Sequence, residues 1–261
     1  MTSKQAVITL YKNRRETPLA CLERFKKENF EYKDEKMTYA GRLDPLAEGL
    51  LLVLVGEECK NKEKYLGLDK EYEVDVLFGF ATDSYDLLGR VTKCLCEQSE
   101  ANQENSGLLH SVRNDIQSFV GKFSQKYPAY SSKTIGGKPL FVLAKSGKLD
   151  EEEIPTKDVE IKSIEFLSQR TISKDALEKY IKDSIALVSG DFRQEEILKS
   201  WQVVFASEAK QSMLYRIISL KVSCTSGTYM RSLANSIGEK VGVPALALNI
   251  KRMRIGDFNN I

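Results

Sequence analysis

The sequence has 261 residues, of which 42% are hydrophobic and 29% charged, and this composition is typical of a globular protein with a sizeable core. The formal net charge of +2 does not by itself indicate nucleic-acid binding. No apolar run reaches the ~18 residues of a membrane span, and the N-terminus lacks the apolar core of a secretory signal, so we expect a cytoplasmic protein without membrane contact.

The chain contains both strand-like and helix-like segments, and this mixture predicts an α+β fold. In the first half, the predicted elements are strands at 6–11, 50–55 and 71–80, a helix over 18–29 and a polar helical piece around 58–66. In the second half, they are helices over 107–121, 139–146 and 228–241 and strands at 158–168 and 214–224.

Residues 172–206 are predicted to form two further helices. Apolar side chains recur there at helical spacing, at Leu177, Tyr180, Ile181 and Ile185. We interpret this segment as an insertion that packs beside the core. Contact with RNA or with a partner protein is the alternative interpretation.

The histidine and cysteine content narrows the possible chemistry. His110 is the only histidine, which argues against a Ser-His-Asp or Cys-His mechanism and against a multi-histidine metal site. The five cysteines are scattered, and Cys94 and Cys96 are too close for a C-x-x-C motif, so a reduced compartment and no metal are expected. No glycine-rich phosphate-binding motif is present, so we expect no nucleotide cofactor and no other cofactor.

The segment 36–56 carries the strongest functional signal. Asp44 precedes Pro45 in a Gly-Arg-Leu-Asp-Pro turn, and the apolar run 50–55 follows. The proline restricts Asp44 to an extended conformation, so its carboxylate is expected in a stiff loop at the end of a buried strand, where catalytic groups are common. An aspartate that caps a short helix over 45–48 is the structural alternative.

Four segments, in order, resemble the TruB family of tRNA pseudouridine synthases. They are GRLDPLAEGLL at 41–51, the block from KEYEV at 70–74 to Gly89, the segment 125–147, and GTYMRSL at 227–233 with its continuation to 253. The resemblance covers most of 36–148 and 216–258. It implies a pseudouridine synthase fold, with a mixed, mostly antiparallel central sheet flanked by helices, in a single catalytic domain over 1–261 without a C-terminal PUA domain.

The resemblance also implies a reaction and three catalytic residues. Such enzymes detach uracil from C1′ of its ribose, rotate it and rejoin it through C5, without an energy source. Asp44 is implied as the catalytic carboxylate, and attack on C1′, attack on the base and abstraction of a sugar proton remain open as its route. Arg231 is implied as the cation that keeps Asp44 ionised. Tyr72 is implied to stack on the target base and to act late as an acid or base.

Further residues are expected to contact the RNA. By the resemblance, Tyr39 stands where the family has a histidine that displaces the target base, and Ile250 lines the pocket. The basic residues expected to bind substrate, at phosphates or at the sheet edge, are Lys12, Arg42, Lys133, Lys138, Lys251 and Arg252. The N-terminal segment around Lys12 lacks the proline and glycine of the family pattern. A solvated charged surface is the alternative for each basic cluster.

These observations predict a monomeric RNA uridine isomerase that acts on uridine 55 in the T-loop of tRNA, with the tRNA T-loop and stem as its partner. A synthase for another RNA site is one alternative. A non-catalytic, tRNA-binding folding chaperone is another. A plain protein-interaction domain would leave the Asp44, Tyr72 and Arg231 motifs unexplained.

Overall fold

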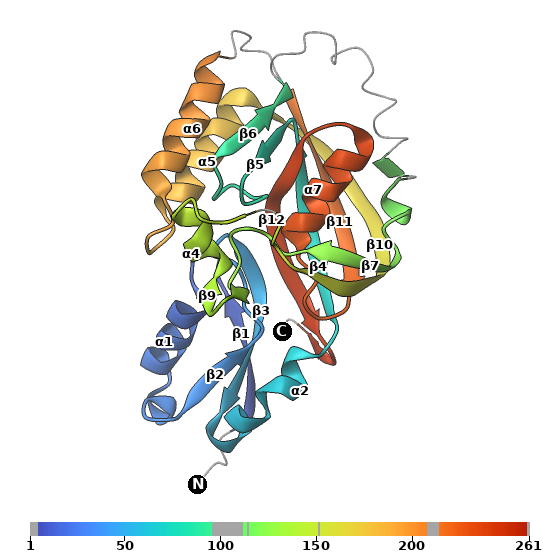
Figure 1. Ribbon diagram of the computed structural model, residues 1–261. Coiled ribbons are helices and arrows are strands. Elements are labelled where there is room, and N and C mark those ends of the chain that lie inside the picture. Colours follow the sequence, from blue (N-terminus) through green and yellow to red (C-terminus); the bar gives the residue numbers. More distant parts are fainter. Residues whose placement is uncertain (1–4, 96–111, 114, 151, 208–213, 260–261) are drawn as a thin grey trace.

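The computed structural model describes residues 5–95, 112–113, 115–150, 152–207 and 214–259, and Figure 1 shows their arrangement. A mixed sheet of nine strands forms the framework of this part of the chain, with the path β1-β3-β12-β4-β11-β10-β7 and with β2 and β13 paired beside it. Its strands are β1 (Val7–Lys12), β2 (Met37–Ala40), β3 (Ala47–Val55), β4 (Lys70–Phe78), β7 (Gly121–Lys126), β10 (Thr156–Ser173), β11 (Leu214–Cys224), β12 (Ala245–Ile255) and β13 (Phe258–Asn259).

Most neighbouring strands are antiparallel, as the family resemblance implied. The pairing of β12 with β3 is parallel, and it joins Ile250 to Ala47 and Arg252 to Gly49. Two small hairpins lie outside the main sheet, namely β5 (Phe80–Thr82) with β6 (Val91–Cys94) and β8 (Thr134–Ile135) with β9 (Lys138–Pro139). The parallel pair brings the segment after Asp44 next to the C-terminal part of the chain.

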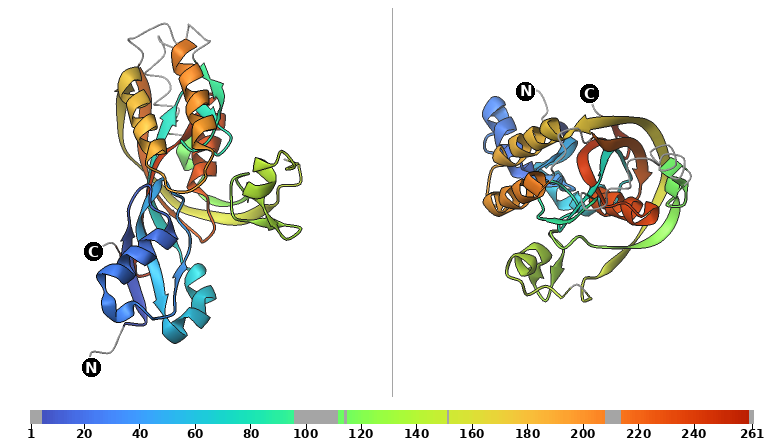
Figure 2. Two further views of the ribbon diagram at one scale, coloured as in Figure 1. Left: turned by 90° about the vertical axis from the view of Figure 1, so that its left-hand side faces the viewer. Right: turned by 90° about the horizontal axis from the view of Figure 1, so that it is seen from above.

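Helices cover both faces of the sheet. They are α1 (Pro18–Glu28), α2 (Lys62–Leu66), α4 (Leu140–Lys145), α5 (Lys174–Ala186), α6 (Gln194–Ser207) and α7 (Met230–Val241), with short 3-10 turns at Phe30–Tyr32 and Gly56–Asn61. In the left view of Figure 2, α5 and α6 lie side by side, and the segment with α4 projects from the body of the molecule. Among the described residues, no helix has the length and apolar character to cross a membrane.

Side-chain alternation along the central strands produces two apolar layers, because successive residues of a strand point to opposite faces. Val74 and Val76 of β4 pack in one cluster with Leu233 and Ile237 of α7. Leu77 belongs to a second cluster on the other face. Its partners there include Ile217 and Leu246 from the sheet and Leu177, Ile181 and Trp201 from α5 and α6. The predicted packing of the inserted helices beside the core is confirmed.

Several predicted boundaries differ from the structure. The strand predicted at 71–80 ends at Phe78, because Gly79 has φ +108° and turns the chain into β5. The strand predicted at 158–168 extends over β10 to Ser173, so the insertion begins with α5. Part of the helix predicted over 107–121 is observed, at 112–113 and 115–117, and β7 begins at Gly121. Residues 107–111, which include His110, lie outside the described residues. The alternative helix over 45–48 is wrong, because β3 starts at Ala47.

Candidate active site

Asp44 lies in the loop between β2 and β3. The neighbouring side chains of Leu43 and Leu46 are 6% and 5% exposed, and they anchor the loop in two different apolar clusters. The backbone N–H of Ala47 donates to the carbonyl of Asp44 at 3.0 Å and closes a tight turn. The Asp44 side chain itself is 38% exposed. The carboxylate is therefore held on a rigid turn but stays open to an incoming molecule.

Arg231 projects from the first turn of α7 and binds Asp44 in a bidentate manner. Its Nε donates to Oδ2 at 2.7 Å and its Nη2 donates to Oδ1 at 3.2 Å, although the two residues are 187 positions apart. The arginine side chain is 3% exposed. Burial alone would lower its pKa, but the carboxylates of Asp44 and Asp86 raise the pKa of Arg231 above its usual value. A permanently charged, fork-shaped donor thus faces the exposed carboxylate.

The remaining donors of Arg231 are bound by backbone carbonyls. Nη1 donates to the carbonyl of Ser84 at 2.8 Å, and Nη2 also reaches the carbonyl of Tyr130 at 3.4 Å. Gln125 on β7 fixes the start of α7, because its side chain accepts from the N–H of Tyr229 and donates to the carbonyl of the same residue. The guanidinium is therefore held by three separate regions of the chain, around Asp44, Ser84 and Tyr130.

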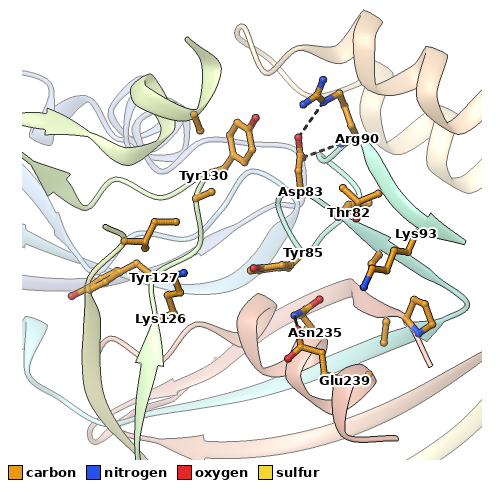
Figure 3. Close-up of a pocket in the computed structure, with 18 of the residues that line it drawn as sticks. Thr82, Asp83, Tyr85, Arg90, Lys93, Lys126, Tyr127, Tyr130, Asn235 and Glu239 are labelled. Atoms are coloured by element: carbon orange, nitrogen blue, oxygen red, sulfur yellow. Dashed lines mark hydrogen bonds and ion pairs between the residues drawn. The ribbon is translucent and has the colours of Figure 1, made fainter. Parts of the chain in front are cut away.

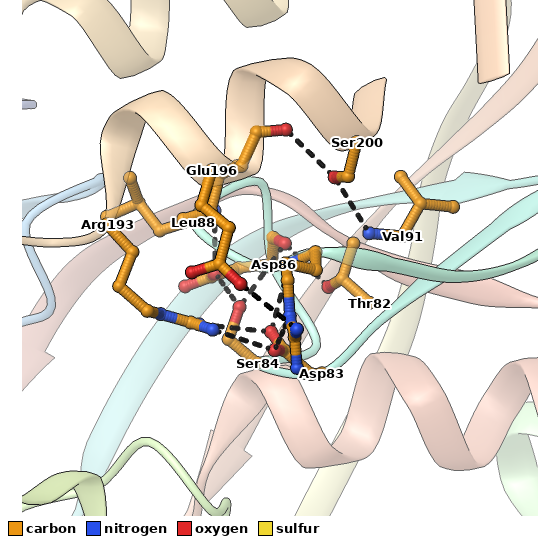
Figure 4. A network of polar contacts seen from close by, with 11 residues as sticks. Thr82, Asp83, Ser84, Asp86, Leu88, Val91, Arg193, Glu196 and Ser200 are labelled. Atoms are coloured by element: carbon orange, nitrogen blue, oxygen red, sulfur yellow. Dashed lines mark hydrogen bonds and ion pairs between the residues drawn. The ribbon is translucent and has the colours of Figure 1, made fainter. Parts of the chain in front are cut away.

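Asp86 is a second carboxylate beside Arg231 that the sequence analysis did not single out as a site residue. It is 6% exposed, and its Oδ2 lies 3.6 Å from Nε of Arg231. Burial raises the pKa of Asp86, and Arg231 opposes this shift. Its Oδ1 accepts hydrogen bonds from the Ser84 hydroxyl at 2.6 Å and from the N–H of Leu88 at 2.9 Å. Ser84 and Asp86 form part of the network in Figure 4.

Tyr72 is 8% exposed and belongs to the same apolar cluster as Leu43 and Ile250. Burial raises the pKa of Tyr72, so its hydroxyl stays protonated near neutral pH. The hydroxyl also hydrogen-bonds with Arg252, its partner in the pairing of β4 with β12. The structure thus brings Tyr72 and Ile250 to the inner side of the Asp44 loop.

Two basic residues predicted to bind RNA are buried instead, and this part of the prediction is wrong. Lys12 is 0% exposed, and its ammonium donates to the carbonyls of Asn13, Pro45 and Ala47, the last at 2.5 Å. Arg252 is 1% exposed, and its guanidinium donates to the carbonyls of Leu50 at 2.8 Å, Gly41 at 3.2 Å and Arg42 at 3.4 Å. Both cations brace the backbone around Asp44 from inside the protein.

The other predicted substrate residues lie at the surface or at its edge. Arg42 is exposed and donates to the hydroxyl of Ser132 at 2.6 Å, which joins the Asp44 loop to the loop before α4. Lys133 and Lys138 are exposed on that second loop, and Lys251 is half-buried on β12. Tyr39 packs against the cluster between β3 and α1, and the ammonium of Lys62 lies 5.6 Å from its ring centroid. The described contacts of Tyr39 do not include Asp44 or Arg231.

A pocket of about 780 Å³, shown in Figure 3, is lined in part by Tyr130, whose carbonyl accepts a hydrogen bond from Arg231. Its lining includes three aromatic side chains, three cations and two polar residues of α7, namely Tyr85, Tyr127, Tyr130, Arg90, Lys93, Lys126, Asn235 and Glu239. Asn235 and Glu239 lie one and two helical turns beyond Arg231. Asp44 does not line this pocket. Rings and cations in one concave surface are the components that bind unpaired nucleotides.

A metal site does not emerge from these groups. Within the described ranges, no group of three or more His, Cys, Asp or Glu side chains is arranged to hold a metal ion. The chemical capacity of the site therefore lies in a partly exposed carboxylate, the buried arginine that binds it, a second buried carboxylate and a protonated tyrosine.

Comparison with known proteins places this chain in a family. Residues 27–184, more than half of the chain, match the model described as TruB family pseudouridylate synthase (N terminal domain). The chain therefore belongs to the TruB family. It is 32% identical over 225 residues to a tRNA pseudouridine synthase B of Thermosipho melanesiensis, covering 86% of this chain and 56% of the relative. A tRNA pseudouridine synthase B of Thermotoga maritima is 28% identical over 253 residues, covering 97% and 63%.

The chain thus spans about 60% of the length of these curated relatives. It also covers 60% of a tRNA pseudouridine synthase B of Lactobacillus acidophilus. Solved structures support the fold. The crystal structure of a Cbf5-Nop10-Gar1 complex matches with a TM-score of 0.55 at 17% identity, covering 97% of this chain and 49% of that chain. An H/ACA RNP bound to a substrate RNA containing 2'-deoxyuridine matches with a TM-score of 0.53 at 18% identity, covering 97% and 48%. The expected fold class is confirmed.

Proposed function

We propose that this protein is an RNA uridine isomerase that converts uridine 55 in the T-loop of tRNA into pseudouridine, with Asp44 as the catalytic carboxylate. The observation that carries the proposal is the bidentate pair between Arg231 and a carboxylate that remains 38% exposed. Family membership supports it, because pseudouridylate synthesis is the activity in the family's description. The continuous path of the sheet from β1 to β7 supports a single catalytic domain.

The proposed reaction breaks the bond from C1′ to N1 and forms a bond from C1′ to C5. The hydrogen on C5 is lost and N1 gains a proton, so the reaction is a balanced isomerisation. Asp44 reacts as the ionised carboxylate by donating an electron pair to C1′ or to the base, or by removing a sugar proton. Arg231 keeps it ionised as the site closes and water leaves.

Tyr72 and the surrounding surface have supporting roles in this proposal. The ring of Tyr72 stacks on the flipped base, which contributes roughly 1–3 kcal/mol to binding. Its protonated hydroxyl is suited to give or relay a proton after the base has rejoined. Arg42, Lys133 and Lys138 are exposed on the two loops that the hydrogen bond from Arg42 to Ser132 joins, and they are suited to contact the phosphates of the T-loop and stem.

The test uses an unmodified tRNA transcript, the purified protein and no added cofactor. Pseudouridine is mapped by carbodiimide treatment and primer extension. A single stop at the T-loop uridine is the expected result. Asp44→Ala should abolish the stop while tRNA binding persists, and Asp175→Asn, which removes an exposed carboxylate from α5, should leave it unchanged.

The other outcomes separate the alternatives. Stops at different positions would keep the isomerase and change its substrate. Tight tRNA binding without any stop would favour the folding chaperone. Activity retained in Asp44→Ala would overturn the proposed role of this aspartate.

A further inference from the structure

The loop between the inserted helices α5 and α6 directs one arginine toward Asp83 and Tyr130. Arg193 directly precedes α6, has φ +61°, and its side chain is 11% exposed. Its Nη1 and Nη2 donate to the two carboxylate oxygens of Asp83 at 3.0 Å and 3.2 Å, and Figure 4 shows this pair. The guanidinium carbon also lies 3.9 Å from the ring centroid of Tyr130. One side chain thus combines a charge-assisted fork with a cation–π contact.

Both partners of Arg193 belong to the support of Arg231. Asp83 is peptide-bonded to Ser84, whose carbonyl accepts from Nη1 of Arg231 at 2.8 Å. Tyr130 accepts from Nη2 of Arg231 with its own carbonyl at 3.4 Å. Arg193 therefore contacts the two segments that supply the backbone acceptors of the arginine bound to Asp44.

The loop that carries Arg193 is itself anchored. The side chain of Gln194 donates to the carbonyls of Val188 and Gly190 and accepts from the N–H of Phe192. Lys145 of α4 binds the carboxylate of Asp191 at 3.0 Å. Behind the loop, side chains of α5 and α6 are packed in the second apolar cluster of the sheet. The inserted helices can therefore serve as a fixed support.

Asp83 also binds a second arginine, but from the solvent side. Arg90 is 51% exposed and divides its guanidinium between Asp83 and Glu196 of α6. Water and salt screen such an exposed pair more strongly than the half-buried pair of Arg193 with Asp83. The contact that couples the insertion to Tyr130 is made by Arg193.

We infer that Arg193 is a positioning residue for the proposed isomerase, which ties the inserted helices to the Ser84 and Tyr130 carbonyls and so fixes Arg231 against Asp44. The inference rests on the proposed function. It assigns the insertion a role in holding the catalytic geometry. A displacement of about 1 Å at such a site lowers a rate roughly 100-fold, so a loss of the fork and the stack should be visible in the chemical step.

The test compares wild type with Arg193→Ala and Arg193→Lys on the same tRNA transcript. Single-turnover rates at saturating protein report the chemical step, and filter binding reports the Kd. Arg193→Ala should lower the rate roughly 10- to 100-fold and change the Kd less than about threefold. Arg193→Lys should not restore the rate, because an ammonium keeps the charge but has neither the fork nor the planar face.

Lys199→Ala is the matched control, because it also breaks an ion pair of α6 but only the exposed one with Glu195. It should retain the wild-type rate. A rate for Arg193→Ala within threefold of wild type would overturn the inference, as would full activity of Arg193→Lys. An equal loss in Lys199→Ala would also overturn it, because the effect would then come from the helices in general.

Hydrogen exchange separates this inference from the proposed function. Arg193→Ala should speed amide exchange in 83–88 and 128–132 relative to Lys199→Ala, whether or not the wild type modifies RNA. Unchanged exchange there would overturn the inference even for an active enzyme. An inactive wild type with faster exchange in the variant would contradict the proposed function and support the structural coupling alone.

Discussion

Gly49 of β3 and Arg252 of β12 lie directly opposite each other in parallel pairing, with their backbones in contact. A Cβ atom on Gly49 would lie 2.8 Å from the amide nitrogen of Arg252 and closer still to its carbonyl oxygen. Gly49 also has φ +108°, a conformation that L side chains rarely adopt. This close approach lets the Arg252 side chain reach under the loop that carries Asp44.

Gly49→Ala should therefore destabilise the protein. We expect a loss of about 3 kcal/mol in the free energy of unfolding, because the new methyl group meets backbone atoms that cannot move aside and the conformation is strained. Urea denaturation measures this loss. Gly56→Ala is the control, since Gly56 has φ +59° but nothing within 4 Å of a built Cβ, and it should lose only about 1 kcal/mol. Equal losses would contradict the steric explanation.

Arg231→Lys should lower the single-turnover rate roughly 100-fold or more while the protein stays folded. Lysine keeps the positive charge but cannot donate to both oxygens of Asp44 and to the Ser84 carbonyl at once. The measurement is pseudouridine formation with saturating protein. Lys240→Ala, on the exposed last turn of the same helix, should retain the rate. Wild-type activity in Arg231→Lys would show that charge alone is sufficient.

Tyr72→Phe should separate binding from chemistry. The ring stays in its cluster, so stability should change by about 1 kcal/mol or less and tRNA affinity should persist. The rate should fall roughly 100-fold, because the variant lacks the hydroxyl that we propose as the proton carrier. Burial raises the pKa of Tyr72, so the ratio of wild-type to variant rates should stay constant between about pH 6 and pH 9. Tyr65→Phe, which removes a hydroxyl bound to Glu58, is the control.

Because Lys12 is buried, we expect the free energy of unfolding to rise with pH in the alkaline range. Burial lowers its pKa from 10.5 to about 8. Between these two values the unfolded chain holds a proton that the folded chain has released, so unfolding takes up a proton and the free energy of unfolding rises with pH. From about pH 7 to pH 10, wild type should gain about 2 kcal/mol relative to Lys12→Met. A difference between the two proteins that does not vary with pH would refute the lowered pKa.

Local sequence patterns predicted much of the fold. Helical periodicity identified α7 and the two inserted helices, and the apolar run after Asp44 identified β3. The sequence analysis missed β12, where Lys251 and Arg252 interrupt the apolar pattern. The buried guanidinium of Arg252 donates to backbone carbonyls of the distant segment 41–50. Local sequence patterns do not predict such partners.

In the candidate site, too, local motifs were recognised and long-range contacts were not. Asp44 and Arg231 were found because each lies in a distinctive motif, and their pairing follows the expectation from the family resemblance. Lys12 and Arg252 were misassigned, because a cation next to other charged residues looks the same in sequence whether it faces solvent or buried carbonyls. The sequence analysis did not find Asp86, Gln125 and Arg193, because their contacts are with residues remote in sequence. Asp86 lies beside Arg231, Gln125 binds the backbone of Tyr229, and Arg193 binds Asp83. For Asp86, the one available signal was its position within the block from residue 70 to Gly89, which resembles the family.

The bidentate pair between Asp44 and Arg231 also bears on the order in which the protein is made. A ribosome delivers the aspartate 187 residues before its partner. During that interval the nascent chain contains the Asp44 carboxylate without the guanidinium that binds it. Fragments that stop short of α7, whether from stalled translation or from proteolysis, therefore lack the ion pair on which the proposed catalytic role of Asp44 depends. In the proposed enzyme, synthesis of the chain must therefore reach α7 before Asp44 has the partner that the reaction requires.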